Sequence, residues 1–99
     1  MPKGYIVGTI TITDKDAYKP YMENTGRIVA RYGGRFIIRG GAMDVLIGET
    51  PYDRVVVIEF DSPEQARAFY DDEEYLEVRK IREENSVGVV MHIEGFDKT

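Results

Sequence analysis

Four stretches of the chain alternate in side-chain character with a period of two, and they constrain the fold more than any other feature. They are Tyr5–Thr13, Arg35–Arg39, Arg54–Phe60 and residues 87–95. This period is typical of β-strands, because successive side chains of a strand point to opposite faces of its sheet. Their many β-branched residues favour strands further. The sequence therefore predicts four strands.

A helical pattern separates the first two strands. From Tyr18 to Tyr32 the apolar residues recur at helical spacing, and Gly33 and Gly34 end the pattern. Pro20 interrupts it, because proline inside a helix removes one hydrogen bond and crowds the preceding turn. We therefore expect either a short first turn with a kink, or a main helix that begins near Pro20.

Signals for further helices follow the third strand. Ser62 and Gln65 occupy the two positions of a capping box, and Asp71 or Asp72 offers a cap for a second segment that runs to about Asn85. The resulting order is strand, helix, strand, strand, helix pair, strand. This order predicts one α+β domain over residues 1–99, with a ferredoxin-like, four-stranded antiparallel sheet and helices on one face.

The glycine pair Gly40 and Gly41 interrupts the second strand. Alternation resumes over residues 43–49, so the sequence predicts that this strand continues past a bulge or bend at the pair. Such a bend would tilt Arg39 over the rim of the sheet.

The predicted sheet has one face covered by helices and one face without them. We assign the more apolar set of each strand to the helices: Ile6, Ile10 and Ile12; Phe36 and Ile38; Val56, Ile58 and Phe60; Val87, Val89, Met91 and Ile93. The other face then carries Tyr5, Val7, Thr9 and Thr11; Arg35, Ile37 and Arg39; Val55, Val57 and Glu59; Val90, His92 and Glu94. Because an apolar patch of this kind usually marks a partner surface, we expect a homodimer through this face.

Five polar residues of the uncovered face form a candidate site. Arg35 and Arg39, with Thr9, are candidates to bind a small anionic or carbonyl-bearing molecule, because a guanidinium group holds a carboxylate through two hydrogen bonds. Glu59 or His92 is the candidate acid or base. On this interpretation the protein is a cofactor-free enzyme or a binder of small molecules.

A structural interpretation of the same residues stays open. Arg39 with Glu59, or Arg35 with Glu94, could form ion pairs that only fix the register of a half-buried sheet. The protein would then be a non-catalytic dimeric module. The sequence does not decide whether the protein is an enzyme.

Composition argues against several other classes of function. The chain has no cysteine and one histidine, so a zinc site is not expected, and no motif indicates another metal or cofactor. A net charge of −5 opposes binding to nucleic acid. No apolar run reaches the roughly 18 to 20 residues of a membrane helix, and the first residues lack the layout of a signal peptide. We therefore expect a cytoplasmic protein.

A resemblance to known proteins rests on six stretches of the chain: GYIVGTITITD, AYKPYMENT, YGGRFIIRGG, RVVVIEF, SPEQARAFYDDEEY and VVMHIEG. From about Gly4 to Gly95 the chain resembles the bacterial family catalogued as domain of unknown function 1330. The resemblance implies a dimeric α+β barrel for which no reaction is established. Wider relatives of that fold include cofactor-free monooxygenases, muconolactone isomerases and haem-handling proteins, and fold kinship alone transfers none of these activities.

Overall fold

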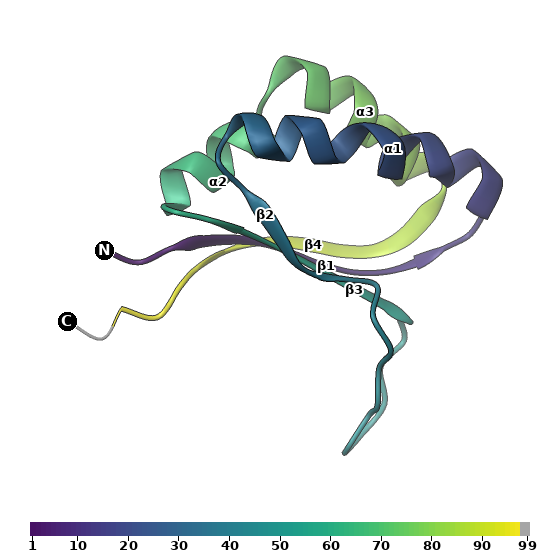
Figure 1. Ribbon diagram of the computed structural model, residues 1–99. Coiled ribbons are helices and arrows are strands. Elements are labelled where there is room, and N and C mark those ends of the chain that lie inside the picture. Colours follow the sequence, from purple (N-terminus) through teal and green to yellow (C-terminus); the bar gives the residue numbers. More distant parts are fainter. Residues whose placement is uncertain (98–99) are drawn as a thin grey trace.

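The computed structural model describes residues 1–97 and confirms the predicted order of elements. The elements are β1 (Gly4–Ile12), α1 (Lys15–Arg31), β2 (Arg35–Arg39), β3 (Arg54–Phe60), α2 (Pro63–Tyr70), α3 (Glu73–Glu84) and β4 (Ser86–Glu94). The strands form one antiparallel sheet in the order β2-β3-β1-β4. All three helices lie on one face of this sheet (Figure 1). Within residues 1–97, no helix has the length and apolar character needed to span a membrane.

Helix α1 begins earlier than Pro20. Asp14 is its N-cap and accepts a hydrogen bond from the Ala17 amide at 3.1 Å, so the helix is already established when it reaches the proline. Pro20 therefore lies inside α1, and the expectation of a main helix that begins at Pro20 was wrong. Asn24 donates a side-chain hydrogen bond to the Pro20 carbonyl at 2.7 Å. Gly33, with a φ of 74°, follows the end of the helix, as predicted.

The predicted starts of the other two helices are confirmed. The Ser62 hydroxyl accepts a hydrogen bond from the Gln65 amide at 3.2 Å, and Pro63 is the first residue of α2. Of the two aspartates, Asp72 caps α3 and accepts from the Tyr75 amide at 2.9 Å. Ser62 thus begins α2, and Asp72 restarts the chain as α3 over the same sheet face.

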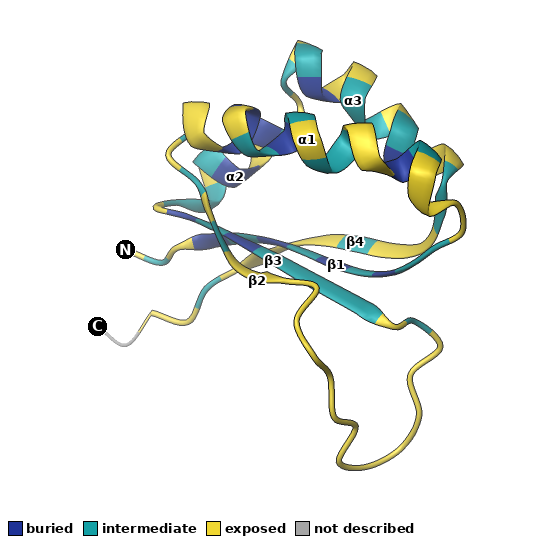
Figure 2. Cartoon of the chain, turned by 45° about the vertical axis from the view of Figure 1, so that its right-hand side comes forward, coloured by how far each residue is buried: buried dark blue, intermediate teal, exposed yellow. Residues whose placement is uncertain are grey.

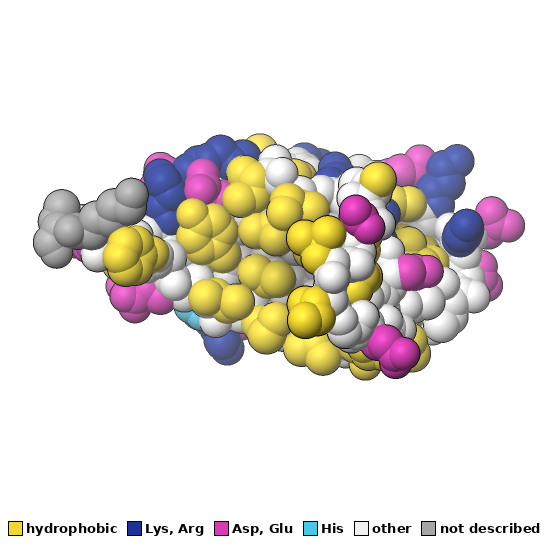
Figure 3. Space-filling view, turned by 90° about the horizontal axis from the view of Figure 1, so that it is seen from below, with side chains coloured by type: hydrophobic (Ala, Val, Ile, Leu, Met, Phe, Trp, Pro, Cys, Tyr) yellow, Lys and Arg dark blue, Asp and Glu magenta, His cyan; other side chains and the backbone are white. Residues whose placement is uncertain are grey.

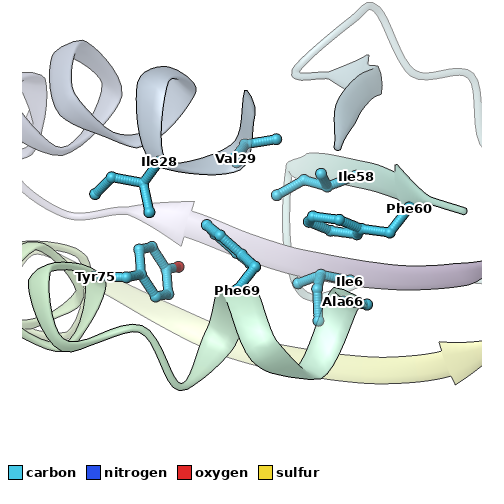
Figure 4. Close-up of a cluster of buried hydrophobic side chains, with 8 residues drawn as sticks. All are labelled: Ile6, Ile28, Val29, Ile58, Phe60, Ala66, Phe69 and Tyr75. Carbon is cyan, nitrogen blue, oxygen red and sulfur yellow. The ribbon is translucent and has the colours of Figure 1, made fainter. Parts of the chain in front are cut away.

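The core lies between the helices and the sheet (Figures 2 and 4). Its buried members come from every helix and from β1 and β3: Ile6, Ile28, Val29, Ile58, Phe60, Ala66, Phe69 and Tyr75. The Phe69 ring is central, with ring centroids 5.4 Å from Phe60 and 4.3 Å from Tyr75. The predicted orientation of Ile6, Ile58 and Phe60 toward the helices is therefore confirmed.

A bulge in β2 changes which residues face the helices. Arg35 lies opposite Glu59 and Phe36 opposite Ile58, but Ile38 lies opposite Val57 because the register shifts between Phe36 and Ile38. One extra residue reverses the side-chain direction of everything that follows it.

Two predictions for β2 were therefore wrong. Ile38 lies on the uncovered face, whereas Arg39, opposite Val56, lies on the helix side. The register shift also falls before Arg39, and the prediction had placed the bulge or bend at Gly40 and Gly41.

The face assignment of β4 was also wrong. His92 pairs with Ile6 and Val90 with Gly8, so both lie on the helix side, because directly paired residues share a face. Glu94, opposite Gly4, lies on that side as well. The more apolar set of β4 faces away from the helices. The prediction failed because it assumed that the helices always take the more apolar set.

The uncovered sheet face, called the bare face below, is consequently more apolar than predicted. Its apolar members are Val7, Ile38, Val55, Val57, Val87, Val89, Met91 and Ile93. Five of them have exposed fractions between 40% and 54%. Figure 3 shows hydrophobic side chains gathered over this side of the molecule. A patch of this size in contact with water indicates a partner surface.

Residues 40–53 do not continue β2. Gly40 takes a φ of 70°, and its amide donates to the Val55 carbonyl at 2.9 Å, so the chain turns out of the sheet there. The prediction of a strand over residues 43–49 was wrong, since the segment has no regular secondary structure. It projects from the sheet on the side opposite the helices (Figures 1 and 2).

Gly88 in β4 occupies a position that only glycine fits. Its φ is 143°, and a Cβ atom there would lie 2.2 Å from the Thr9 carbonyl oxygen. We predict that Gly88→Ala lowers the free energy of unfolding by about 1–3 kcal/mol, measured by urea denaturation. Gly41→Ala is the matched control, because a Cβ atom at Gly41 meets no atom within 4 Å. Equal stability of both variants would contradict the prediction.

Ion pairs join α1 to the start of α3. Glu74 accepts hydrogen bonds from Arg27 and Arg31, the latter at 2.8 Å, and these arginines lower the pKa of Glu74 from 4.5 to about 2. A carboxylate with a lowered folded-state pKa stabilises the protein above its unfolded pKa. That contribution is lost as the pH falls through the folded value.

We predict that the stability difference between wild type and Glu74→Gln depends on pH. At pH 7 the variant should have the lower free energy of unfolding, because Gln cannot carry the charge that the arginines stabilise. Below about pH 4.5 the difference should shrink, and it should close near pH 2. Glu23→Gln, an exposed change on α1, is the control and should show no such trend. A difference that stays constant from pH 7 to 2 would refute this role for Glu74.

Candidate functional site

Arg35 forms ion pairs on the bare face. Its Nε atom donates to Glu59 at 2.8 Å, and a terminal nitrogen donates to Asp61 at 3.1 Å. The second Glu59 oxygen accepts from the Tyr5 hydroxyl at 2.8 Å. The Tyr5 hydroxyl and Arg35 hold the pKa of Glu59 below its ordinary value. A carboxylate held ionised in this way is a weak base and a poor proton donor.

The structure separates the other predicted site residues from this cluster. Arg39 lies on the helix side, where it donates to the Met22 carbonyl at 3.0 Å and its guanidinium carbon is 4.0 Å from the centre of the Phe36 ring. The predicted Arg39–Glu59 pair is therefore wrong, because the two side chains lie on opposite faces. The alternative Arg35–Glu94 pair is wrong as well, since β2 and β4 are the two edges of the sheet.

His92 and Thr9 are also apart from each other. His92 faces the helices, and its Nε2 atom lies 3.1 Å from the Pro63 carbonyl oxygen. It borders a cavity of about 100 Å³ that Arg67 and Tyr70 also line. Thr9 stays on the bare face, paired with Val55 and Val89. Of the five predicted residues, the structure thus brings together only Arg35 and Glu59.

A second and better-formed site lies between the helices and the sheet. It is a cavity of about 40 Å³, which has room for about three water molecules. Residues of all four strands form its floor, and α1 and α3 cover it with Tyr18, Tyr21 and Tyr75. Three arginines line it: Arg39, Arg54 and Arg82. Among the described lining residues there is no Asp or Glu, so this cavity is positive in a chain whose net charge is −5.

Arg82 is the central charge of this site. Its exposed fraction is 8%, and it donates to the hydroxyls of Tyr75 and Tyr70, both at 3.0 Å. Its nearest carboxylate oxygen among residues 1–97 belongs to the exposed Glu83, at 3.9 Å. A guanidinium group has five N–H donors and is always charged. Arg82 is thus a buried cation whose hydrogen-bond partners are neutral, an arrangement that favours an anion nearby.

The tyrosine hydroxyls beside Arg82 are hydrogen-bond donors at neutral pH. Burial raises the pKa of Tyr18 to about 12 and raises that of Tyr75 as well. The Tyr21 and Tyr75 oxygens are 2.6 Å apart. Because Tyr75 accepts from Arg82, it can donate its own hydrogen to Tyr21. The hydrogen of Tyr21 is then free for another acceptor.

A groove of about 410 Å³ reaches Arg82 from the other side. It runs between the end of α3 and the start of β4, and its lining includes Tyr70, Arg82, the exposed Glu83 and Val90. Arg82 thus borders both the 40 Å³ cavity and this groove. Arg54 adds a further unused donor, since its buried Nε atom has no hydrogen-bond partner within residues 1–97.

Sequence reasoning did not name Arg82, Tyr70 or Tyr75 as site residues, and it used Tyr18 only as part of a helical apolar pattern. A signal was present for Arg82. It lies seven residues after Tyr75, which is two helical turns along the buried face of α3. A charged residue at an apolar position of a helix is unusual, and this one marks the site.

The described residues give no metal centre. Within residues 1–97, no group of three or more His, Cys, Asp or Glu side chains is arranged to hold a metal ion.

Comparison with known proteins supports the fold. A protein of unknown function from Rhodopseudomonas palustris superposes with a TM-score of 0.74 at 20% identity, over 97% of this chain and 84% of that one. SnoaB, a cofactor-independent oxygenase from Streptomyces nogalater, superposes with a TM-score of 0.58 at 14% identity, over 100% of this chain and 96% of SnoaB. A dimeric protein of unknown function and ferredoxin-like fold from Bacteroides fragilis superposes with a TM-score of 0.60 at 16% identity, over 94% of this chain and 95% of that one.

These identities establish the ferredoxin-like α+β fold and carry no activity. No curated protein matches the chain. A family model matches residues 3–96, nearly the whole sequence. The chain belongs to the family described as Domain of unknown function (DUF1330).

Proposed function

We propose that this protein is a homodimer that binds a small anionic metabolite at Arg82. The observation that carries the proposal is the burial of the Arg82 guanidinium group between two tyrosine hydroxyls, with no carboxylate hydrogen-bonded to it among residues 1–97. Isolating a charge from water costs several kcal/mol, and a bound anion offsets that cost. The anionic group would contact Arg82, and the remainder of the molecule would lie in the adjoining groove.

The same site supports a catalytic version of this proposal. The Tyr21 hydroxyl could donate a hydrogen bond to a substrate carbonyl, while Arg82 stabilises developing negative charge through Tyr75. A cofactor-independent oxygenase has this fold, which shows that the architecture accommodates chemistry without a cofactor. Arg35 and Glu59 are better explained as structural, because their charges pair with each other and with Asp61.

The bare face supports the dimer. Its apolar side chains would meet water in a single copy, and a second copy is the simplest surface of matching shape and chemistry. The Bacteroides fragilis protein with this fold is described as dimeric. The two sites of the dimer would each lie within one protomer, on the outer side of its sheet.

We predict that Arg82→Met removes anion binding without unfolding the protein. The groups that lose Arg82 as a partner are the neutral hydroxyls of Tyr70 and Tyr75, so the change leaves no unpaired charge in the core, and methionine keeps much of the apolar volume of the side chain. Thermal unfolding would be followed with acetate, benzoate and inorganic phosphate at constant ionic strength. An anion at about 100 times its Kd stabilises the folded state by about 2.7 kcal/mol.

The control for this experiment is Arg67→Met, a change at an exposed arginine that does not line the cavity beside Arg82. Wild type and the control should respond to at least one of the three anions, and Arg82→Met should respond to none. If Arg82→Met keeps the wild-type response, the site is not at Arg82.

We predict that Val57→Asp dissociates the dimer. Val57 lies between Val7 and Ile38 on the bare face, so a second sheet would bury the new carboxylate without a partner. Sedimentation equilibrium at micromolar concentration should give twice the chain mass for wild type and the chain mass for the variant. Lys19→Asp, on the exposed side of α1, is the control and should remain dimeric. A monomeric wild type would refute the dimer.

A further inference from the structure

Residues 40–53, called the arm below, have an apolar end that nothing in the described chain covers. Leu46 and Ile47 have exposed fractions of 88% and 93%, and the nearby Met43 and Val45 are also exposed. The arm projects on the same side of the sheet as the bare face (Figures 1 and 2). Two adjacent aliphatic side chains held out in water are costly unless another surface covers them.

Contacts at the base of the arm set its direction. The Gly40 amide bonds to the Val55 carbonyl at 2.9 Å, and the Asp53 amide bonds to the Thr11 hydroxyl at 3.3 Å. Near the returning end, the Thr50 hydroxyl donates to the Tyr52 carbonyl at 3.1 Å. The two ends of the arm are therefore attached to β3 and β1. Between these attached ends the arm projects away from the sheet (Figures 1 and 2).

The length of the arm fits a second copy. About seven residues lead out and about seven return, so the end can reach about 23 Å from the sheet. Two sheets that pack face to face lie about 10 Å apart. The arm can therefore cross the interface and run beside the sheet of the second copy. A two-fold axis would place both arms in this way.

We infer that the arm is a clasp, and that Leu46 and Ile47 pack against the second copy of the chain in the homodimer. The inference rests on the proposed dimer. The charge of the arm argues against a lipid surface as the alternative occupant, since Asp44, Glu49 and Asp53 are acidic and residues 40–53 contain no Lys or Arg. Anionic lipids would repel such a segment.

The test is the dimer dissociation constant of the double variant Leu46→Ser, Ile47→Ser. Sedimentation equilibrium should show an increase of about tenfold or more, because four aliphatic side chains lose their apolar surroundings in the dimer. The folded monomer should be unaffected, since both residues are exposed in the single chain. Leu76→Ser, at an exposed leucine on α3, is the control and should leave the constant unchanged.

Hydrogen exchange gives a second measurement on the same proteins. Amides of residues 43–48 should exchange more slowly in the wild-type dimer than in the monomeric Val57→Asp variant. A dimeric wild type with the same dissociation constant as the double variant would overturn the clasp and leave the dimer intact. A monomeric wild type would overturn both the clasp and the dimer. The anion experiment tests the site at Arg82 independently of this result.

A vesicle experiment addresses the lipid alternative. Wild type should stay in solution when vesicles of phosphatidylcholine and phosphatidylglycerol are sedimented. If wild type sediments with these vesicles and the double variant does not, the clasp is overturned in favour of a membrane contact.

Discussion

A four-stranded sheet has two faces, and this chain supplies helices for only one of them. Each strand alternates its side chains between the faces, so a strand that contributes Ile6, Ile58 or Phe60 to the helical core also carries a second set of side chains that points the other way. On β4 that second set is the more apolar one. The fold therefore forms a complete core on one side of the sheet and needs a second surface on the other.

The helical side is itself not uniformly apolar. Phe69 and its neighbours fill one end of the layer, whereas Arg82 and its tyrosine partners occupy the region beneath α1 and α3. The tyrosines contribute ring surface to the core and hydroxyls to the guanidinium group at the same time. This dual role explains how the charged side chain of Arg82 can have an exposed fraction of only 8% in a chain of this size. The proposed anion site is therefore built from the core itself.

The sequence predicted the fold because its strong local signals agree with one another. The caps at Ser62 and Asp72 and the alternation of β1 and β3 each indicate one local structure, and together they fit one topology. The site was harder to predict, because it depends on register. The extra residue at Ile37 placed Arg39 on the other face of the sheet. Strand β4 has apolar residues on both of its faces, so the sequence did not show which face His92 is on.

Arg82 escaped prediction for a different reason. Its neighbours in the site come from α1, α2 and α3, so no local pattern joins them. Helical spacing could show that Arg82 points inward, but only the packing of three helices shows that it meets hydroxyls in place of a carboxylate. Local patterns thus locate single buried residues, whereas a site assembled from distant elements requires the tertiary structure.

The arm connects the bare face with the cavity beside Arg82. Arg39 ends β2 immediately before the arm, Arg54 begins β3 immediately after it, and both line the cavity beside Arg82 on the helix side. A contact that orders the arm on the bare-face side thereby acts on the backbone that holds two cavity arginines. If pairing of two copies changes the affinity for the anion, the anion changes the affinity between the copies by the same factor and in the same direction. The antiparallel strands β2 and β3 are the physical connection between the two faces.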